Sequence, residues 1–278
     1  MMKKLSYFCL ILSVFLFLGA SSVFSASLDE TAGKIENSFA AKKPYGHASQ
    51  EIDGLTVDQA YEIQARFVKI RENKGDEVMG YKAGLTSAAA QQKFGVKEAA
   101  RGTLFKSMFR WPGTLYQKNF ARMFIETEIG FRFGKDITEP VEDIESLKKA
   151  VAIIFPAVEL PDLAFKDMKA IKGTDIIAAN VVARKVLIGD AVWVKDLNAI
   201  EVKLFHNGQE IAGGMGKNAL GDQWEALKWV VNNVLARGGE IKDGYVVITG
   251  CISKLLPAKP GNYVADYGDF GKIEFEFK

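Results

Sequence analysis

Three glutamates are the residues of this sequence whose types and spacing best suit a shared chemical task. Glu126 and Glu128 lie two positions apart in the segment IETEIGF, which has the composition of a β-strand, and Glu159 lies in the apolar segment FPAVELPD. Successive side chains of a strand point to opposite faces, so Glu126 and Glu128 share one face. Carboxylates gathered in an apolar setting need protons or a cation, and oxygen ligands suit a hard divalent ion such as Mg²⁺, Mn²⁺ or Ca²⁺.

The same pattern has a simpler interpretation. Apolar residues alternate with Glu126, Glu128 and Arg132 along the strand over residues 123–133. An antiparallel strand with one face in water shows this alternation, and for the strand alone that interpretation is favoured. Glu159 could equally be a surface residue of a neighbouring strand. The spacing of the glutamates therefore leaves a metal site and a solvated surface both open.

Few other chemistries fit the composition. The sequence has 2 histidines, His47 in a polar segment and His206 beside a predicted turn, which disfavours a histidine triad or a histidine-rich zinc site. It contains no G-x-S-x-G nucleophile elbow, phosphate loop or G-x-G-x-x-G fingerprint. The 36 basic and 34 acidic residues nearly cancel, so we expect no nucleic-acid partner. Carboxylates and lysines remain as the candidate reactive groups.

The first 26 residues have the layout of a secretory signal peptide. Two lysines precede an apolar block over residues 7–18, and small residues follow up to position 26. The apolar block is too short to span a bilayer comfortably. We therefore expect cleavage after Ser25 or Ala26, export to the periplasm, and no stable membrane span in the mature chain. Cys251 is then the only cysteine left, which excludes an intrachain disulfide.

The elements that must position the glutamates predict an α+β fold in one main domain. We expect strands over residues 77–84 and 123–133, a hairpin at Asn207-Gly208, and a helix over residues 222–236. The segment VEDIESLKKAVAIIFPAVEL predicts a helix that ends at Pro156, followed by a short strand that holds Glu159. The predicted division of the chain is a signal peptide (1–26), a helical N-terminal lobe (27–75) and a main domain (76–278).

Five segments occur in the order and spacing of one enzyme family. They are GYKAGLTSAAAQQKFGV, IETEIGFRFGKDI, PAVELPD, NGQEIAGGMGKNALGDQWEALKWVVNNVLARGGEIKDGYVVITG and PAKPGN. On these segments the chain resembles the 2-keto-4-pentenoate hydratase and 2-oxo-3-hexenedioate decarboxylase family, within the fumarylacetoacetate hydrolase superfamily. The resemblance implies a mixed β-sheet roll with flanking helices and a small helical N-terminal lobe. It also implies a small 2-oxo acid substrate, a divalent cation (Mg²⁺ or Mn²⁺, with Ca²⁺ as an alternative) and a homo-oligomer.

The resemblance assigns roles to residues of this chain. Glu126, Glu128 and Glu159 match the metal ligands, which favours the metal site over the solvated surface. Lys82 matches a lysine at the active site, where it would carry a proton or act as an electrostatic partner; the alternative is a simple counter-ion of the glutamates. The residues predicted to shape the site or contact the substrate are Leu85, Thr86, Ser87, Asp162, Asn180 and, at a position that departs from the family pattern, Arg184.

The segment IIAANVVARKVLIG departs from the family pattern. Ala179 stands where an aspartate is expected, and Val182 and Ala183 stand where a serine is expected. Arg184 replaces a usual glycine, and Lys254 lies in a loop that usually holds small or apolar residues. The two cations could be surface changes, or they could recognise a dicarboxylate or a longer acidic substrate.

Three functions follow from these observations. The first is a divalent-metal-dependent hydratase, or a decarboxylase of the same family, acting on a small 2-oxo (2-hydroxydienoic) acid. The second is an exported protein that binds a metal and a keto acid without turnover, which the missing aspartate and serine suggest. A carbon–carbon hydrolase is disfavoured, because the histidine with which such relatives activate water is not found.

Overall fold

The computed structural model describes residue 25, residues 27–192 and residues 194–278 of the chain. Apart from Ser25, the predicted signal peptide lies outside the described residues. Within the described part of the chain, no helix is both long and apolar enough to cross a bilayer. The helices are residues 27–41, α2 (Ala48–Glu51), α3 (Val57–Asn73), α4 (Ala88–Phe94), α5 (Ile144–Ala150), α6 (Gly173–Ala178) and α7 (Gln223–Ala236).

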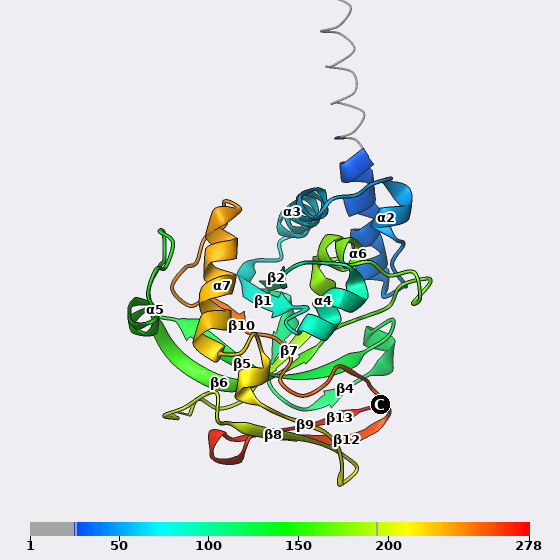
Figure 1. Cartoon of the computed structure of the whole chain (residues 1–278). Coiled ribbons are helices and arrows are strands. Elements are labelled where there is room, and N and C mark those ends of the chain that lie inside the picture. The colour runs from blue at the N-terminus through cyan, green and yellow to red at the C-terminus, as the bar shows by residue number, and fades with distance from the viewer. Residues whose placement is uncertain (1–24, 26, 193) are drawn as a thin grey trace, which may run out of the picture.

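Two curled sheets form the body of the molecule (Figure 1). The 8-stranded sheet has the order β2-β1-β10-β5-β6-β7-β3, with β11 paired to β5, and the 5-stranded sheet has the order β4-β13-β12-β8-β9. The strands are β1 (Val78–Gly84), β2 (Ala100–Phe105), β3 (Phe109–Arg110), β4 (Thr114–Leu115), β5 (Phe124–Phe133), β6 (Val151–Leu160), β7 (Lys185–Ile188), β8 (Glu201–His206), β9 (Gln209–Met215), β10 (Val246–Ile248), β11 (Leu256–Pro257), β12 (Gly261–Asp266) and β13 (Lys272–Phe277). The predicted α+β class is confirmed.

The strand β5 is buried on both faces. Ile125, Ile129 and Phe131 pack into a core that also takes in the 5-stranded sheet and α7. Glu126 and Glu128 point to the opposite face, where a second core joins the N-terminal helices and α6 to the sheet. Arg132 alone on this strand is exposed, Glu128 is fully buried and Glu126 is mostly buried, so the interpretation of these glutamates as surface residues is wrong.

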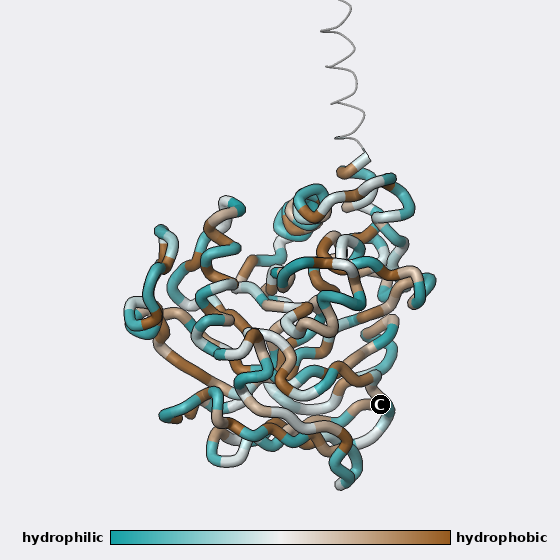
Figure 2. Tube along the Cα trace, in the orientation of Figure 1, coloured by the Kyte–Doolittle hydropathy of each residue, from teal (hydrophilic) through white to brown (hydrophobic). Residues whose placement is uncertain are grey.

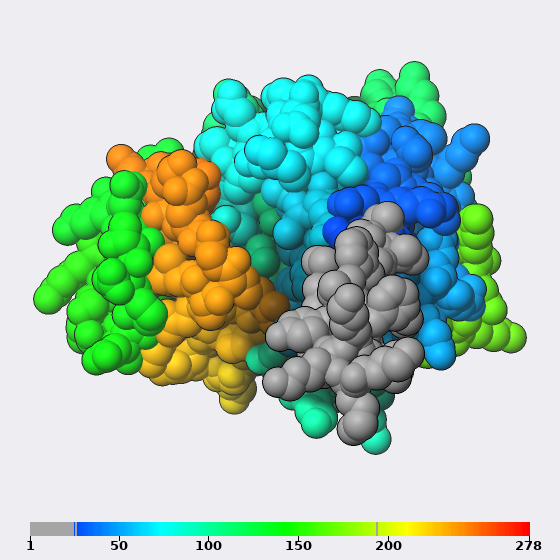
Figure 3. Space-filling model, turned by 90° about the horizontal axis from the view of Figure 1, so that it is seen from above, coloured from blue at the N-terminus to red at the C-terminus, as the bar shows by residue number. Residues whose placement is uncertain are grey.

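Helices cover the glutamate-bearing face. Residues of the helix 27–41, α2, α3 and α6 pack on this face, whereas α7 packs on the opposite one. Seen from above, α3 lies between α7 and the helix of residues 27–41 (Figure 3). Figure 2 shows hydrophobic residues along the strands and hydrophilic residues at the loop tips. The second core unites Phe39 and Phe67, from the predicted lobe, with Phe105 and Ile177 of the main domain. The predicted boundary at residue 75 stays a prediction.

The hairpin and the C-terminal helix form as predicted. Asn207 (φ 51°) and Gly208 (φ 81°) connect β8 to β9, which is the left-handed turn geometry that Asn-Gly favours. The carboxylate of Asp222 accepts hydrogen bonds from the main-chain nitrogens of Trp224 and Glu225, and it thereby caps α7.

The predicted helix ending at Pro156 is wrong. Only Ile144–Ala150 is helical, and β6 begins at Val151 and runs through Pro156 to Leu160. The carbonyl of Pro156 accepts from the nitrogen of Gly189, just past the end of β7. The main-chain N and O of a strand residue point to the same side, so the nitrogen of Pro156 also points toward Gly189, beyond the end of β7. No residue of β7 needs a hydrogen bond from that nitrogen, so the proline does not interrupt the pairing of β6 with its neighbours. The β-branched and aromatic residues of this segment then favour a strand.

Candidate metal centre

Strand register brings the three predicted metal ligands together. Glu126 on β5 pairs directly with Glu159 on β6, and Glu128 lies one diagonal step away on the same face. One carboxylate oxygen from each of the three residues lies within 4.8 Å of the others. Oxygens that share a Mg²⁺, Mn²⁺ or Ca²⁺ ion at 2.0–2.6 Å from its centre are separated by comparable distances. The sheet thus builds an all-oxygen cluster from two adjacent strands.

Two oxygens of this cluster are buried and have no hydrogen-bond partner within the described part of the chain. They are Oε1 of Glu128 and Oε1 of Glu159. The other oxygen of Glu128 accepts from the main-chain nitrogen of Gly250 at 2.7 Å, and the other oxygen of Glu159 accepts from Lys82. Buried polar atoms are rarely left without a partner. Two unpartnered carboxylate oxygens beside a third carboxylate are the donor set that a divalent cation would complete, so the residues fit a metal ion.

Lys82 lies on the same face as the glutamates. It pairs with Ile248 of β10, which is aligned in turn with Gly130 of β5. The ammonium group bonds to Glu159 and lies 4.0 Å from Oε2 of Glu126. Burial lowers the pKa of Lys82, but the attraction of Glu159, Glu126 and Glu128 outweighs it and raises the pKa above its ordinary value. Lys82 is therefore an ammonium ion at neutral pH.

Burial raises the pKa values of the three carboxyl groups despite Lys82. The pKa rises to about 7 for Glu126 and Glu128 and to about 8 for Glu159. Removal from water disfavours the charged carboxylate, and each negative neighbour adds to that effect. Three carboxylates and one ammonium leave two negative charges, which a divalent cation would balance. Without the ion, protons must take its place.

A small cavity opens onto the cluster. Its volume is about 50 Å³, and both Lys82 and Glu126 line it. The side chain of Glu126 is 15% exposed, whereas those of Lys82 and Glu159 are 2% and 0% exposed. Larger hollows of about 650, 440 and 480 Å³ lie elsewhere and contain none of the predicted site residues. This cavity gives access to the cluster on the side of Glu126.

Leu85, Thr86 and Ser87, which the resemblance implied would shape the site, form the segment that follows β1. Leu85 lines the cavity and has a left-handed backbone (φ 54°). Thr86 is buried beside Gly250, and its side chain occupies the space that a Cβ atom on Gly250 would need. The hydroxyl of Ser87 accepts from the nitrogen of Ala90 at 3.2 Å and caps α4. Of the three, only Leu85 reaches the cavity with its own surface.

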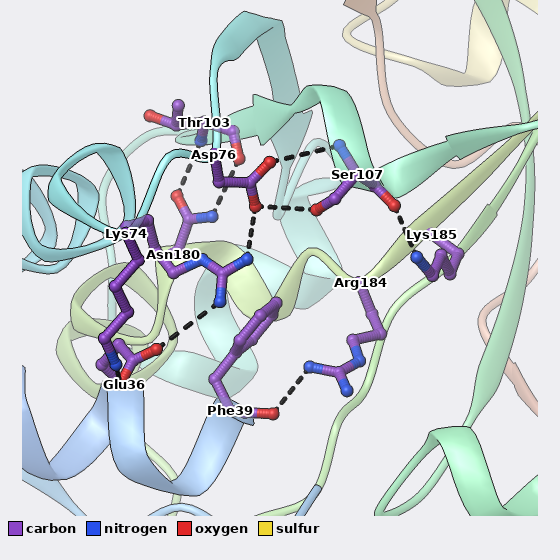
Figure 4. Close-up of polar contacts among 10 residues, drawn as sticks. Glu36, Phe39, Lys74, Asp76, Thr103, Ser107, Asn180, Arg184 and Lys185 are labelled. Atoms are coloured by element: carbon purple, nitrogen blue, oxygen red, sulfur yellow. Dashed lines mark hydrogen bonds and ion pairs between the residues drawn. The ribbon is translucent and has the colours of Figure 1, made fainter. Parts of the chain in front are cut away.

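Asp162 and Arg184, for which substrate contact was predicted, do not line this cavity, and their contact with substrate stays a prediction. The carboxylate of Asp162 accepts from the main-chain nitrogens of Ala121 at 3.0 Å and Arg122 at 2.6 Å. Arg184 donates to the carbonyl of Phe39 at 2.7 Å and lies 4.2 Å from the centre of its ring (Figure 4). Both side chains satisfy main-chain groups away from solvent and so hold the fold.

Asn180 is likewise committed to the main chain. Its side-chain oxygen accepts from the nitrogen of Thr103 at 2.7 Å, and its amide donates to the Thr103 carbonyl at 2.8 Å (Figure 4). These two bonds clamp β2 to the segment that follows α6, and substrate contact by Asn180 stays a prediction. Lys254, the other added cation, lies exposed in its loop.

The Asn180 clamp holds an unusual turn. Asn180, Val181 and Val182 all have left-handed backbones, with φ of 55°, 50° and 50°. Such a conformation is unfavourable for β-branched residues and costs on the order of 1–3 kcal/mol each. Gly84 and Gly102 allow the turn to approach: a Cβ on Gly84 would lie 2.4 Å from Cγ1 of Val181, and one on Gly102 would lie 2.8 Å from the Asn180 carbonyl. Sequence periodicity carried no signal for this turn.

Sequence reasoning also missed two contributions from the segment after β10. The main-chain nitrogen of Gly250 holds Glu128, as described above. Burial, followed by the charge of Glu126, raises the pKa of the Cys251 thiol well above its ordinary value, so the thiol stays protonated beside the cluster. The segment TGC carries no recognised motif, and only three-dimensional proximity identifies it.

Comparisons with known proteins place the chain among hydratases. A 2-hydroxyhexa-2,4-dienoate hydratase of Comamonas testosteroni is 31% identical over 215 residues, which is 75% of this chain and 81% of that protein. A 2-keto-4-pentenoate hydratase of Paraburkholderia xenovorans (strain LB400) is 27% identical over 255 residues, which is 90% of this chain and 94% of that protein. No family model matches the chain.

Solved structures show the same fold. The 4-oxalocrotonate decarboxylase from Pseudomonas putida G7, complexed with magnesium and adipate, aligns with a TM-score of 0.86 at 23% identity and covers 91% of this chain and 98% of its own. The fumarylpyruvate hydrolase from Pseudomonas aeruginosa, in complex with Mn²⁺ and pyruvate, aligns with a TM-score of 0.56 at 13% identity and covers 71% and 88%. The chain belongs to the 2-keto-4-pentenoate hydratase and 2-oxo-3-hexenedioate decarboxylase family of the fumarylacetoacetate hydrolase superfamily.

Proposed function

We propose that this protein is a divalent-cation-dependent hydro-lyase that acts on a small 2-oxo acid in its 2-hydroxydienoic form. The observation that carries the proposal is the pair of buried, unpartnered oxygens of Glu128 and Glu159, which face Glu126 beside the buried ammonium of Lys82. The curated relatives support hydration, since they are named as hydratases. Decarboxylation is the alternative within the same family, and the solved structure with the TM-score of 0.86 is a decarboxylase.

Glu126, Glu128 and Glu159 would hold the cation, for which Mg²⁺ or Mn²⁺ is the first candidate and Ca²⁺ the alternative. A bound divalent ion supplies a Lewis acid that draws electron density from the 2-oxo group of a substrate. The three carboxylates would fix the position of the cation. They lie on two paired strands, β5 and β6, and paired strands hold side chains more rigidly than a loop does. The Gly250 nitrogen fixes the orientation of Glu128 at 2.7 Å.

Lys82 holds a proton at Nζ on the cavity side of the cluster. Because the acidic neighbours raise its pKa, the lysine acts first as an acid or as an electrostatic partner of developing negative charge, and not as a ready base. The carbonyl of Val181, 3.5 Å from Nζ, and the Glu159 carboxylate orient the ammonium. Apolar walls keep bulk water from the site, which strengthens these charge interactions.

Turnover of 2-hydroxypenta-2,4-dienoate tests the proposal. With added Mg²⁺ or Mn²⁺ the protein is expected to deplete the dienol, which is followed by the fall in its ultraviolet absorbance, and mass spectrometry of the product should show the gain of one water. A parallel assay with 2-oxo-3-hexenedioate, whose distal carboxylate can leave its electron pair in the enolate, tests for loss of carbon dioxide. Glu128→Gln should abolish turnover, whereas Glu210→Gln, at an exposed glutamate of β9, should not change it. Metal-dependent binding of the acid without any turnover would instead support the non-catalytic binding protein.

We further propose that the chain is exported to the periplasm and cleaved near Ser25 or Ala26. The lysine pair, short apolar block and small-residue segment of the sequence support this proposal. Fractionation of expressing cells, followed by N-terminal sequencing of the mature protein, tests it. A full-length protein recovered with its first residues intact contradicts it.

We also propose that the mature protein is a homo-oligomer, as the family resemblance implies. Light scattering coupled to size-exclusion chromatography measures the mass in solution. A mass of about one chain contradicts this proposal and leaves the reaction unaffected.

A further inference from the structure

We infer that the cavity selects a monocarboxylic 2-oxo acid with a short hydrocarbon tail and discriminates against a second carboxylate at the far end of the substrate. The inference rests on the proposed function, because it takes the 2-oxo acid head group to bind at Glu126, Glu128 and Glu159. The remaining lining of the cavity would then contact the tail of the substrate.

The cavity is polar at one end only. Lys82 and Glu126 form that end, and apolar side chains from five separate parts of the chain form the walls. The apolar wall residues include Leu85, Phe94, Leu163, Ile176, Val182 and Leu255. A substrate whose head group reaches the carboxylate cluster must therefore lay its tail against hydrocarbon.

The wall at Val181 and Val182 is fixed in place. The Asn180 side chain bonds to both main-chain groups of Thr103, and Gly84 leaves space for the Val181 side chain. Farther along, the Gln64 amide donates to the carbonyl of Ile177 at 2.8 Å and thereby ties the end of α6 to the helical lobe. These contacts hold the left-handed turn, so the valines cannot readily withdraw and expose polar groups to a substrate.

A distal carboxylate would find no partner inside the cavity. Of the described residues that line it, Lys82 alone is positively charged, and its ammonium is already bonded to Glu159. Arg184 is turned toward the Phe39 carbonyl. Lys93 and Lys254 are exposed, and the ammonium of Lys93 lies 5.0 Å above the Phe94 ring. Burying an unpaired carboxylate is strongly unfavourable, so a second acid group should weaken binding.

The size of the cavity also disfavours a second carboxylate. It measures about 50 Å³. One water molecule needs roughly 10–15 Å³ of such volume, so the cavity holds a few waters or a short unbranched chain, and it is too small for a carboxylate that keeps its full hydration shell. The far end of the substrate must therefore lose its hydration water on entering the cavity. This desolvation costs little free energy for an alkyl group and much more for a carboxylate.

Calorimetry with three inert acids tests the inference on the mature protein loaded with Mn²⁺. Oxalate has the chelating head group alone, 2-oxopentanoate adds an alkyl tail, and 2-oxoglutarate has the same carbon number with a terminal carboxylate. We expect oxalate to bind, and 2-oxopentanoate to bind at least ~30-fold more tightly than 2-oxoglutarate, which is the order of discrimination that a pocket achieves against an ill-matched polar group. Equal or tighter binding of 2-oxoglutarate, with oxalate still bound, overturns the inference and leaves the proposed function standing. Failure of oxalate to bind overturns both.

A charge placed in the wall provides the second measurement. Leu255 lies at the mouth and is 38% exposed, so Leu255→Arg should fold. We expect this variant to reduce the preference for 2-oxopentanoate by about tenfold, because the guanidinium supplies the missing partner. Ile211→Arg, at an equally exposed residue of β9 in the other sheet, controls for added positive charge and should leave the preference unchanged. An unchanged preference in Leu255→Arg contradicts the assignment of this wall to the substrate tail.

Discussion

Removal of divalent metal should make the stability of this protein fall as pH rises. Burial raises the pKa values of Glu126 and Glu128 to about 7 and that of Glu159 to about 8, far above the ordinary value of 4.5. The folded metal-free protein therefore binds more protons than the unfolded chain between pH 4.5 and 8. The contribution of these three carboxyl groups to the free energy of unfolding is present in full below pH 4.5, and it is lost as the pH rises through about 7–8.

The magnitude follows from these shifts. Each pKa unit corresponds to about 1.4 kcal/mol, so one carboxylate whose pKa is raised to about 7 contributes a loss of about 3 kcal/mol across the window. Because the three groups share their environment, we take one such loss as the minimum for the cluster. For a domain of this size, a loss of about 3 kcal/mol lowers the melting temperature by roughly 6–12 °C. Groups with lowered pKa values, such as Asp76 and Asp222, lose their contribution only at acidic pH, outside this window.

Thermal unfolding in EDTA at about pH 5.5 and about pH 8.5 measures the effect. Between these two pH values one such group loses about 2 kcal/mol, so the wild type should melt roughly 4–8 °C lower at the higher pH. Mn²⁺ in place of EDTA should restore the melting temperature, since binding to the folded state alone stabilises that state. Glu128→Gln, which cannot ionise, should show a smaller pH effect and little rescue by metal. Glu210→Gln, at an exposed glutamate, should behave as the wild type. A metal-free wild type whose melting temperature differs by less than about 2 °C between the two pH values refutes this reasoning.

Three substitutions test the surroundings of the cluster. Lys82→Met should lower kcat at least ~100-fold, as loss of a proton carrier does, while calorimetry should show metal binding retained or tightened, because a positive charge leaves the cluster; near-normal turnover would make Lys82 a counter-ion only. Asn180→Ala leaves two main-chain groups of Thr103 unpaired and should cost about 2–4 kcal/mol in urea unfolding, with normal stability arguing against the clamp. Gly84→Ala places a Cβ 2.4 Å from Val181 and should cost about 1–3 kcal/mol and raise KM; an unchanged KM would show that the turn does not shape the cavity.

Local patterns were sufficient for the elements that local chemistry controls. The alternation along β5, the Asn207-Gly208 turn and the Asp222 cap each depend on neighbours in sequence. Pro156 misled the prediction because its effect depends on whether a neighbouring strand needs its nitrogen, and that neighbour comes from residues far along the chain.

In the candidate site, too, some features could be predicted from the sequence and others depend on contacts between distant parts of the chain. The resemblance selected Lys82 and the three glutamates, and register across β1, β10, β5 and β6 places them on one face. Asp162, Asn180 and Arg184 have side chains typical of substrate contacts, but distant main-chain groups need their hydrogen bonds. Sequence shows that a residue is polar, and it does not show which buried group the residue will satisfy. The left-handed turn at Val181 was missed for the same reason, since distant contacts impose its backbone against local preference.

Metal binding by the glutamate cluster is the central claim, and titration calorimetry of the mature protein tests it most directly. Mg²⁺, Mn²⁺ and Ca²⁺ are titrated into the wild type, Glu126→Gln and Glu128→Gln, each with and without oxalate. We expect the wild type to bind one divalent ion per chain and to bind oxalate only when the ion is present, and we expect both substitutions to abolish or severely weaken binding of the ion. A wild type that binds none of the three ions, or variants that bind them as tightly as the wild type, would contradict the claim that Glu126, Glu128 and Glu159 form a metal centre.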